Sequence, residues 1–107
     1  MDRDDLVIPE GTTWARGWRV TYNGAPIGPE WTTRAQIRAR AGGADVLHTF
    51  AADVVDGCAV IAADPDETLG WTWDLARYDV TVTSPDGVVI RVAEGRAVYR
   101  RGVTRDE

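Results

Sequence analysis

The sequence predicts an all-β fold, an antiparallel β-sandwich of about seven to nine short strands with one short helical turn. The clearest signal lies in the last third of the chain, where Tyr78, Val80 and Val82 alternate with polar residues, the period of a half-buried strand. Residues Ser84 to Gly87 then read Ser-Pro-Asp-Gly, in which proline suits the second position of a turn and glycine accepts positive φ. Such runs, separated by turn signals, recur along the chain.

The strand that pairs with this one is predicted at Val88 to Val92. We expect Glu94-Gly95 to break it, because glycine weakens the interior of a strand, and Arg96 to Arg100 to form one more strand. A unit of this kind holds its shape by cross-strand pairing and carries no chemistry of its own. It therefore indicates a scaffold or a binding module.

The N-terminal part of the chain predicts two strands and a tight turn. Leu6 to Ile8 is a short apolar strand, and residues 12–22 form a longer one whose even-numbered positions carry the aromatic side chains. We expect a bulge at Arg16-Gly17. Asn23-Gly24 is a strong tight-turn signal, and residues 25–30 are expected to be a loop.

The middle of the chain predicts three more strands. In residues 31–40 alanine and Ile37 alternate with arginine and glutamine, and Ile37 alone cannot form the apolar stripe of a helix, so a strand is favoured. The glycines of residues 41–44 are expected to turn the chain into strands at 45–52 and 56–63.

Residues 64–68 predict the single helical turn. Asp64 suits an N-cap, Pro65 suits the first turn, and acidic residues follow. Asp64, Asp66 and Glu67 offer the only metal-like cluster in the sequence, but the segment is short and interrupted by proline, so the helix cap is favoured over a calcium loop. We expect no metal site.

Length and charge restrict the class of protein. A chain of 107 residues predicts one domain, residues 1–107. The net charge of −5 argues against general binding to nucleic acid or to an anionic membrane. The single cysteine, Cys58, excludes an internal disulfide, and the acidic first residues differ from the basic start of a signal peptide, so we expect a soluble protein made in the cytosol.

All 12 basic residues are arginine. One interpretation is selection for bidentate contacts to carboxylate or phosphate. The other is a coding sequence of high GC content, which also favours alanine, glycine, valine and aspartate.

Residues for catalysis are few. The chain has one histidine, His48, and one serine, Ser84, whose hydroxyl is explained by local bonding within its turn. A nucleophile and base pair would require these two residues to meet. Cys58 on an apolar strand suits a small buried side chain. We expect no enzyme activity and no cofactor.

The five tryptophans and the charged ends are the candidate interaction residues. We expect two or three tryptophans, including Trp14 and Trp18, in the core, and one or two exposed at an interface. The acidic start, with Asp2, Asp4 and Asp5, contrasts with an arginine-rich C-terminal part. The candidate interface residues are Trp31, Trp71, Arg96, Arg100, Arg101 and Arg105.

An ordered set of motifs over most of the chain resembles the small β-sandwich domains of tailed-bacteriophage virion proteins, which occur in baseplate, tail-fibre-associated and other structural proteins. The matching pieces are Gly11-Thr12-Thr13-Trp14, Asn23-Gly24-Ala25-Pro26, the alternating alanines and arginines, a strand from Gly57, Asp64 to Thr68, Tyr78-Asp79-Val80, Ser84 to Gly87, Gly95, and Val103-Thr104-Arg105.

The resemblance implies a non-enzymatic structural subunit of a virion, associated with the tail, baseplate or capsid. Its partners would be other virion structural proteins, in many copies of a symmetric assembly, and its location the virion after synthesis in the host cytoplasm. The alternative hypothesis is a carbohydrate- or ligand-binding β-sandwich module that uses exposed tryptophans as a stacking surface.

Overall fold

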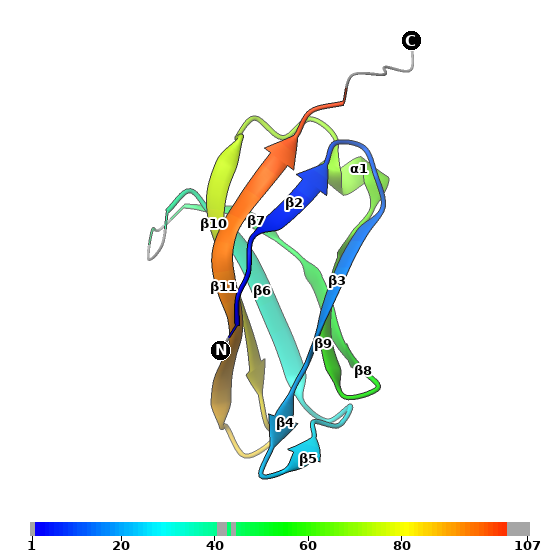
Figure 1. Cartoon of the computed structure of the whole chain (residues 1–107), viewed down its shortest axis with the longest axis vertical. Coiled ribbons are helices and arrows are strands. Elements are labelled where there is room, and N and C mark those ends of the chain that lie inside the picture. The colour runs from blue at the N-terminus through cyan, green and yellow to red at the C-terminus, as the bar shows by residue number, and fades with distance from the viewer. Residues whose placement is uncertain (1, 41–42, 44, 103–107) are drawn as a thin grey trace.

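Two β-sheets face each other in the computed structural model, which describes residues 2–40, 43 and 45–102 (Figure 1). The larger sheet has six strands in the order β1-β11-β10-β6-β7, with β2 also paired to β11, and the smaller has the order β3-β9-β8. The elements are β1 (Asp2–Arg3), β2 (Leu6–Pro9), β3 (Trp14–Arg19), β4 (Thr21–Tyr22), β5 (Ala25–Pro26), β6 (Thr32–Arg38), β7 (Val46–Thr49), β8 (Ala51–Val55), β9 (Cys58–Ala63), α1 (Pro65–Thr68), β10 (Leu75–Thr83) and β11 (Val89–Arg100).

The all-β class and the single helical turn are confirmed. Eight of the strands have four or more residues, within the expected range, and β1, β4 and β5 are two-residue segments. Pairing is mostly antiparallel, but β1 and β2 both run parallel to β11. Parallel strands need a long crossover connection, and here the intervening chain supplies it. Within the described residues, no helix has the length and apolar character that a membrane crossing requires.

The core lies between the sheets and is filled by the inward positions of the predicted period-2 runs. Ile37, Ile61 and Val80 are fully buried. The Tyr78 ring stacks on the Trp18 ring with centroids 6.3 Å apart, a contact that joins β10 of the larger sheet to β3 of the smaller. These side chains hold the two sheets together.

The chain passes from one sheet to the other at Phe50. Its amide donates to the carbonyl oxygen of Ala35 in β6 at 3.0 Å, and its ring is buried. The expectation of one strand over residues 45–52 is therefore wrong, because β7 belongs to the larger sheet and β8 to the smaller.

Side chains bridge the two sheets on the other side, between β2 and β3. Trp14 Nε1 donates to the carbonyl oxygen of Val7 at 3.1 Å, and Arg16 forms an ion pair with Asp4. The expected bulge at Arg16-Gly17 is wrong: β3 keeps an unbroken register with β9, because the pleat runs without an extra residue from Trp14 to Trp18.

The strand β11 is continuous, so the expected break at Glu94-Gly95 is also wrong. Gly95 pairs with Tyr78, and a Cβ built on it would lie 2.3 Å from the Asp4 carbonyl oxygen. The glycine allows the backbone of the N-terminal segment to approach β11 closely at Asp4, between the two stretches where it pairs with that strand. The irregularity lies instead near Val92, where the register with β10 shifts.

Two hairpins use turns with positive φ at both central residues. Asn23-Gly24, with φ of 52° and 78°, was predicted and connects β4 to β5, so Ala25-Pro26 is a strand rather than loop. Asp56-Gly57, with φ of 50° and 77°, connects β8 to β9. The strand expected from residue 56 therefore starts two residues later, at Cys58.

The helical turn α1 is anchored on both sides. The Asp64 amide donates to Glu67 Oε1 at 2.9 Å, as in a capping box. Thr68 is fully buried, and its hydroxyl contacts the backbone of Thr12. The Tyr99 hydroxyl donates to the Thr68 carbonyl oxygen. The turn is thus part of the packed structure.

Candidate interaction surfaces

The end of the sandwich that carries α1 holds a cluster of aromatic rings. Trp71 and Trp73 stack with centroids 5.1 Å apart, and the Tyr99 ring lies 5.2 Å from Trp71 and 5.5 Å from Trp73. The rings of this aromatic cluster are Trp14, His48, Phe50, Trp71, Trp73 and Tyr99.

Residues 69–75, which link α1 to β10, expose apolar side chains beside these rings. Leu69 is 62% exposed and Leu75 is 58% exposed, whereas the two tryptophans between them are half-buried. The Tyr99 amide donates to the Asp74 carbonyl oxygen at 2.9 Å and ties the segment to β11. The segment therefore presents leucine and tryptophan from a fixed backbone.

Arg101 holds the same segment from the far end of β11. Its guanidinium donates to the Trp71 carbonyl oxygen and to the Asp74 carboxylate, both at 2.9 Å, and lies 5.4 Å from the centroid of Tyr99. A guanidinium over an aromatic face is attracted by the ring quadrupole. The structure thus brings together Trp71 and Arg101, two candidates that the sequence placed 30 residues apart.

His48 is half-buried among the rings of the aromatic cluster. Burial lowers its pKa below the usual value, and the Glu67 carboxylate, 3.7 Å from Nε2, opposes that change. Ser84 does not contact it: the Ser84 hydroxyl accepts the Val88 amide at 2.9 Å within the β10–β11 turn. The structure does not assemble a nucleophile and base from these two residues.

A second surface lies on the outer face of the larger sheet. Strand register places Arg77 of β10 directly between Arg96 of β11 and Arg38 of β6. We refer to these three residues as the arginine row. They line an open groove of about 830 Å³, bordered on one side by the N-terminal segment.

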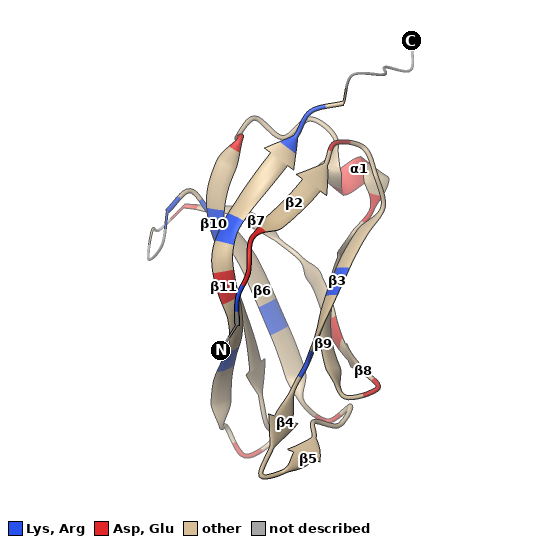
Figure 2. Cartoon of the chain, in the orientation of Figure 1, with Lys and Arg blue, Asp and Glu red and all other residues tan. Residues whose placement is uncertain are grey.

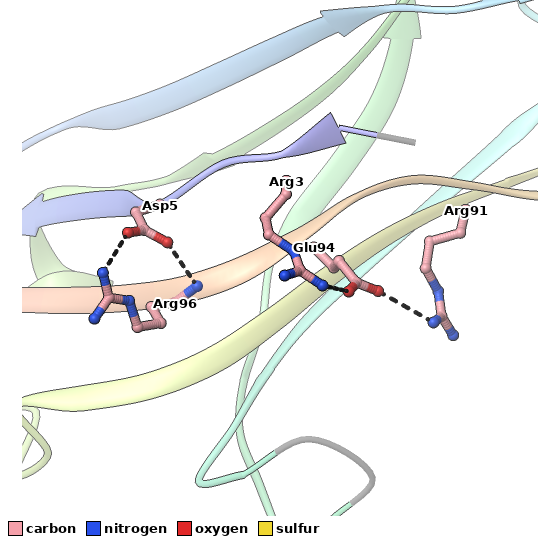
Figure 3. Close-up of polar contacts among 5 residues, drawn as sticks. All are labelled: Arg3, Asp5, Arg91, Glu94 and Arg96. Carbon is pink, nitrogen blue, oxygen red and sulfur yellow. Dashed lines mark hydrogen bonds and ion pairs between the residues drawn. The ribbon is translucent and has the colours of Figure 1, made fainter.

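Carboxylates pair with several arginines around this groove (Figure 3). Asp5 accepts hydrogen bonds from Arg96, at 2.9 Å from the guanidinium and 3.2 Å from the amide. Those bonds lower the pKa of Asp5 and raise that of Arg96. Glu94 lies between Arg3, at 3.5 Å, and Arg91, at 3.3 Å. Figure 2 shows the resulting bands of opposite charge along β11.

The remaining interface candidates fall in different places. Trp31 is only 9% exposed and packs edge-on against Tyr22, so the expectation that it is exposed is wrong. The β4–β5 hairpin, which supplies Tyr22, covers that end of the core. Arg100 is exposed at the end of β11, in register with Pro9. Arg105 lies outside the described residues.

The acidic start of the chain contacts the chain itself. Asp4 pairs with Arg16 and Asp5 with Arg96, within a segment that forms β1 and β2. In the structure Asp4 and Asp5 are used to hold the N-terminal segment in place.

Several acidic side chains of the described residues are used in contacts within the chain. Among the described residues, no group of three or more histidine, cysteine, aspartate or glutamate side chains could hold a metal ion. In the acidic segment before Leu69, Asp64 and Glu67 are joined to each other in the helix cap.

The arginine row was missed by sequence reasoning. Arg38 and Arg77 each looked like the ordinary polar member of an alternating strand, and only strand register shows that they are neighbours. The repeated arginines of residues 34–40 were the available signal, but a single strand does not reveal what lies beside it.

The chain matches no model of a known protein family and no curated protein.

Proposed function

We propose that the protein is a non-enzymatic structural subunit of a tailed-phage virion that acts through protein–protein contacts. The observation that carries the contact role is the exposed segment 69–75, in which Leu69 and Leu75 flank the stacked Trp71 and Trp73. Apolar side chains grouped on a rigid backbone are typical of the centre of a protein interface. Assignment to a tailed phage rests on the ordered motifs from Gly11 to Arg105.

The segment is well suited to docking because little ordering remains to be done on binding. Arg101 and Tyr99 already hold its backbone, so the entropy cost of fixing the loop is met in the free protein. A partner that covers Leu69 and Leu75 removes them from water, which is the main favourable term in most associations. Repeated copies in a symmetric particle would add such contacts together.

Mass spectrometry of gradient-purified phage particles tests the proposal, together with complementation of a gene deletion by variants. We expect the wild-type protein in particles at a fixed copy number. A Leu69→Ser/Leu75→Ser double variant should fold but fail to incorporate. Val89→Ser is the matched control, because Val89 is an equally exposed apolar residue, 63% accessible, in β11 away from this segment.

Full incorporation of the double variant would exclude the segment as the docking site. Absence of the wild-type protein from intact particles would refute the virion role itself. Circular dichroism of each variant confirms that the sheet content is unchanged.

One observation favours a second function, binding of a carbohydrate or similar ligand. The stacked Trp71 and Trp73 are half-exposed, with the carboxylate of Asp74 and the guanidinium of Arg101 beside them. Aromatic faces with adjacent polar groups are suited to a ligand that has apolar and hydroxyl faces. Saturable quenching of tryptophan fluorescence by a glycan, lost in Trp71→Ala, would support this function; no response across a broad glycan panel would exclude it.

A further inference from the structure

The arginine row places three guanidinium groups side by side, and the carboxylate of Asp5 pairs with one of them, that of Arg96. Its three side chains lie on adjacent strands about 4.8 Å apart, so Arg38 and Arg96 are separated by about 10 Å with Arg77 between them. Like charges directly opposite in a sheet are destabilising. A row of positive charge that opens onto a groove is a candidate binding surface.

The members of the row differ in how they are satisfied. Arg96 pairs with Asp5, and Arg38 donates to the Gly43 carbonyl oxygen at 2.6 Å and to Gln36 Oε1 at 2.8 Å. Arg77 is exposed and has no hydrogen bond or ion pair with any described residue. The middle of the row is thus a guanidinium with all its donors available.

The chain itself shows how a carboxylate binds here. Asp5 comes from an extended segment that lies beside β11, and its two oxygens accept from the Arg96 guanidinium and the Arg96 amide (Figure 3). A guanidinium suits this role because its planar fork matches the two oxygens of a carboxylate. A second extended segment beside Asp5 would meet Arg77 in the same way.

We propose that the arginine row binds an acidic segment of a partner protein. Arg77 binds one carboxylate of that segment, and Arg38 binds neighbouring carboxylates of the same segment. Side chains on one face of an extended peptide are about 6.7 Å apart, a spacing that long arginine side chains can match across neighbouring strands. The proposal names the partner chemistry of a second contact and rests on the proposed function, in which the chain acts through protein contacts.

The charges next to the row favour a peptide over a nucleic acid. Asp79 and Glu94 form the adjacent row across the same strands, paired in register with each other. A nucleic acid carries a phosphate at every nucleotide, so some of its phosphates would face these carboxylates. The net charge of −5 also opposes nucleic-acid binding. A peptide has charge only where its side chains place it, so it can contact the arginine row alone.

The experiment measures binding of a fluorescein-labelled oligoglutamate peptide to the full chain by fluorescence anisotropy. An ionic strength of about 0.01 M is suitable, because the Debye length is then about 30 Å. Arg77→Gln should weaken binding by roughly tenfold or more, the expected effect of losing a charge-assisted contact. Arg19→Gln is the matched control, since it removes one exposed arginine from the smaller sheet. It should leave the dissociation constant within about twofold of wild type, as expected for a charge away from the site.

Several outcomes would overturn the proposal. They are no saturable binding, equal weakening by both variants, or a single-stranded oligonucleotide that competes as well as the peptide. Self-association in sedimentation that Arg77→Gln abolishes would assign the row to a second copy of this chain instead. Failure of peptide binding leaves the particle experiment unaffected, because that experiment depends on Leu69 and Leu75.

Discussion

Two explanations of why glycine stands at position 95 predict opposite changes in the free energy of unfolding when Gly95 is replaced by alanine. If Gly95 only weakened the strand, alanine would raise the free energy of unfolding by about 0.5–1 kcal/mol, because it reduces the freedom of the unfolded chain. The structure predicts the reverse. A Cβ at this position would lie 2.3 Å from the Asp4 carbonyl oxygen and 3.0 Å from its carbonyl carbon.

The size of the effect follows from what must move. A carbon and a carbonyl oxygen stay at least about 3.3 Å apart, so the Asp4 carbonyl has to shift by about 1 Å. That shift strains the bond from the Asp4 amide to the Glu94 carbonyl oxygen, at 3.0 Å, and the bond from the Tyr78 hydroxyl to Asp4. Two hydrogen bonds at about 1 kcal/mol each, with overpacking of about 1–3 kcal/mol, amount to about 3–5 kcal/mol, and the gain of about 0.5–1 kcal/mol from the less flexible unfolded chain leaves a net loss of about 2–4.5 kcal/mol.

Urea unfolding of Gly95→Ala beside Gly17→Ala measures this loss. Gly17 also lies inside a strand, but a Cβ there meets Val60 at 3.5 Å and Ala59 at 3.7 Å, which are ordinary contacts. The control should be neutral or slightly stabilised. A Gly95→Ala protein as stable as wild type, or more stable, would refute the close approach of the Asp4 carbonyl group to Gly95.

The remaining predictions concern three side chains in different surroundings. Arg77→Gln should raise the free energy of unfolding by roughly 0.2–1 kcal/mol, since it removes the middle of three like charges. A lower free energy of unfolding, measured with urea, would contradict this. Tyr99→Phe should lower the free energy of unfolding by about 1–2 kcal/mol, because the buried Thr68 carbonyl oxygen loses its hydrogen-bond donor; an unchanged Tm would contradict this. Burial lowers the folded pKa of His48 below 6.5, with Glu67 opposing, so the unfolded chain binds the proton first. Stability should therefore be full above pH 6.5 and fall as the pH drops toward the folded pKa, and His48→Gln should flatten that part of the profile; a profile unchanged by the substitution would exclude His48 as its source.

Local patterns were enough to predict most strands, because alternation reports which side chains face the core. The pattern in residues 78–82 and the Asn23-Gly24 turn are examples in which local chemistry and final structure agree. The Asp56-Gly57 turn carried an equally strong signal but was assigned to a strand. Alternation continued through Phe50, because that residue is buried at the point where the chain leaves one sheet for the other.

What depended on register or on distant segments could not be predicted from local patterns. The parallel pairing of β1 and β2 with β11 is one case, and the position of Arg77 between two other arginines is another. Trp31 was expected at the surface because nothing in the sequence shows that Tyr22 packs against its ring. In each case the missing information was which segment lies beside which.

The pairing of β2 with β11 also has a consequence during synthesis of the chain. Leu6 and Ile8 are buried only when residues 89–100 have been made, and contacts such as that of Asp5 with Arg96 join residues 91 apart. Until then these apolar side chains have no partner strand, the condition in which nascent chains aggregate. Charged residues that flank an apolar strand act as gatekeepers against such association. We therefore expect the acidic residues that precede Leu6 to oppose aggregation of an emerging chain, before Asp4 and Asp5 form their ion pairs in the folded protein.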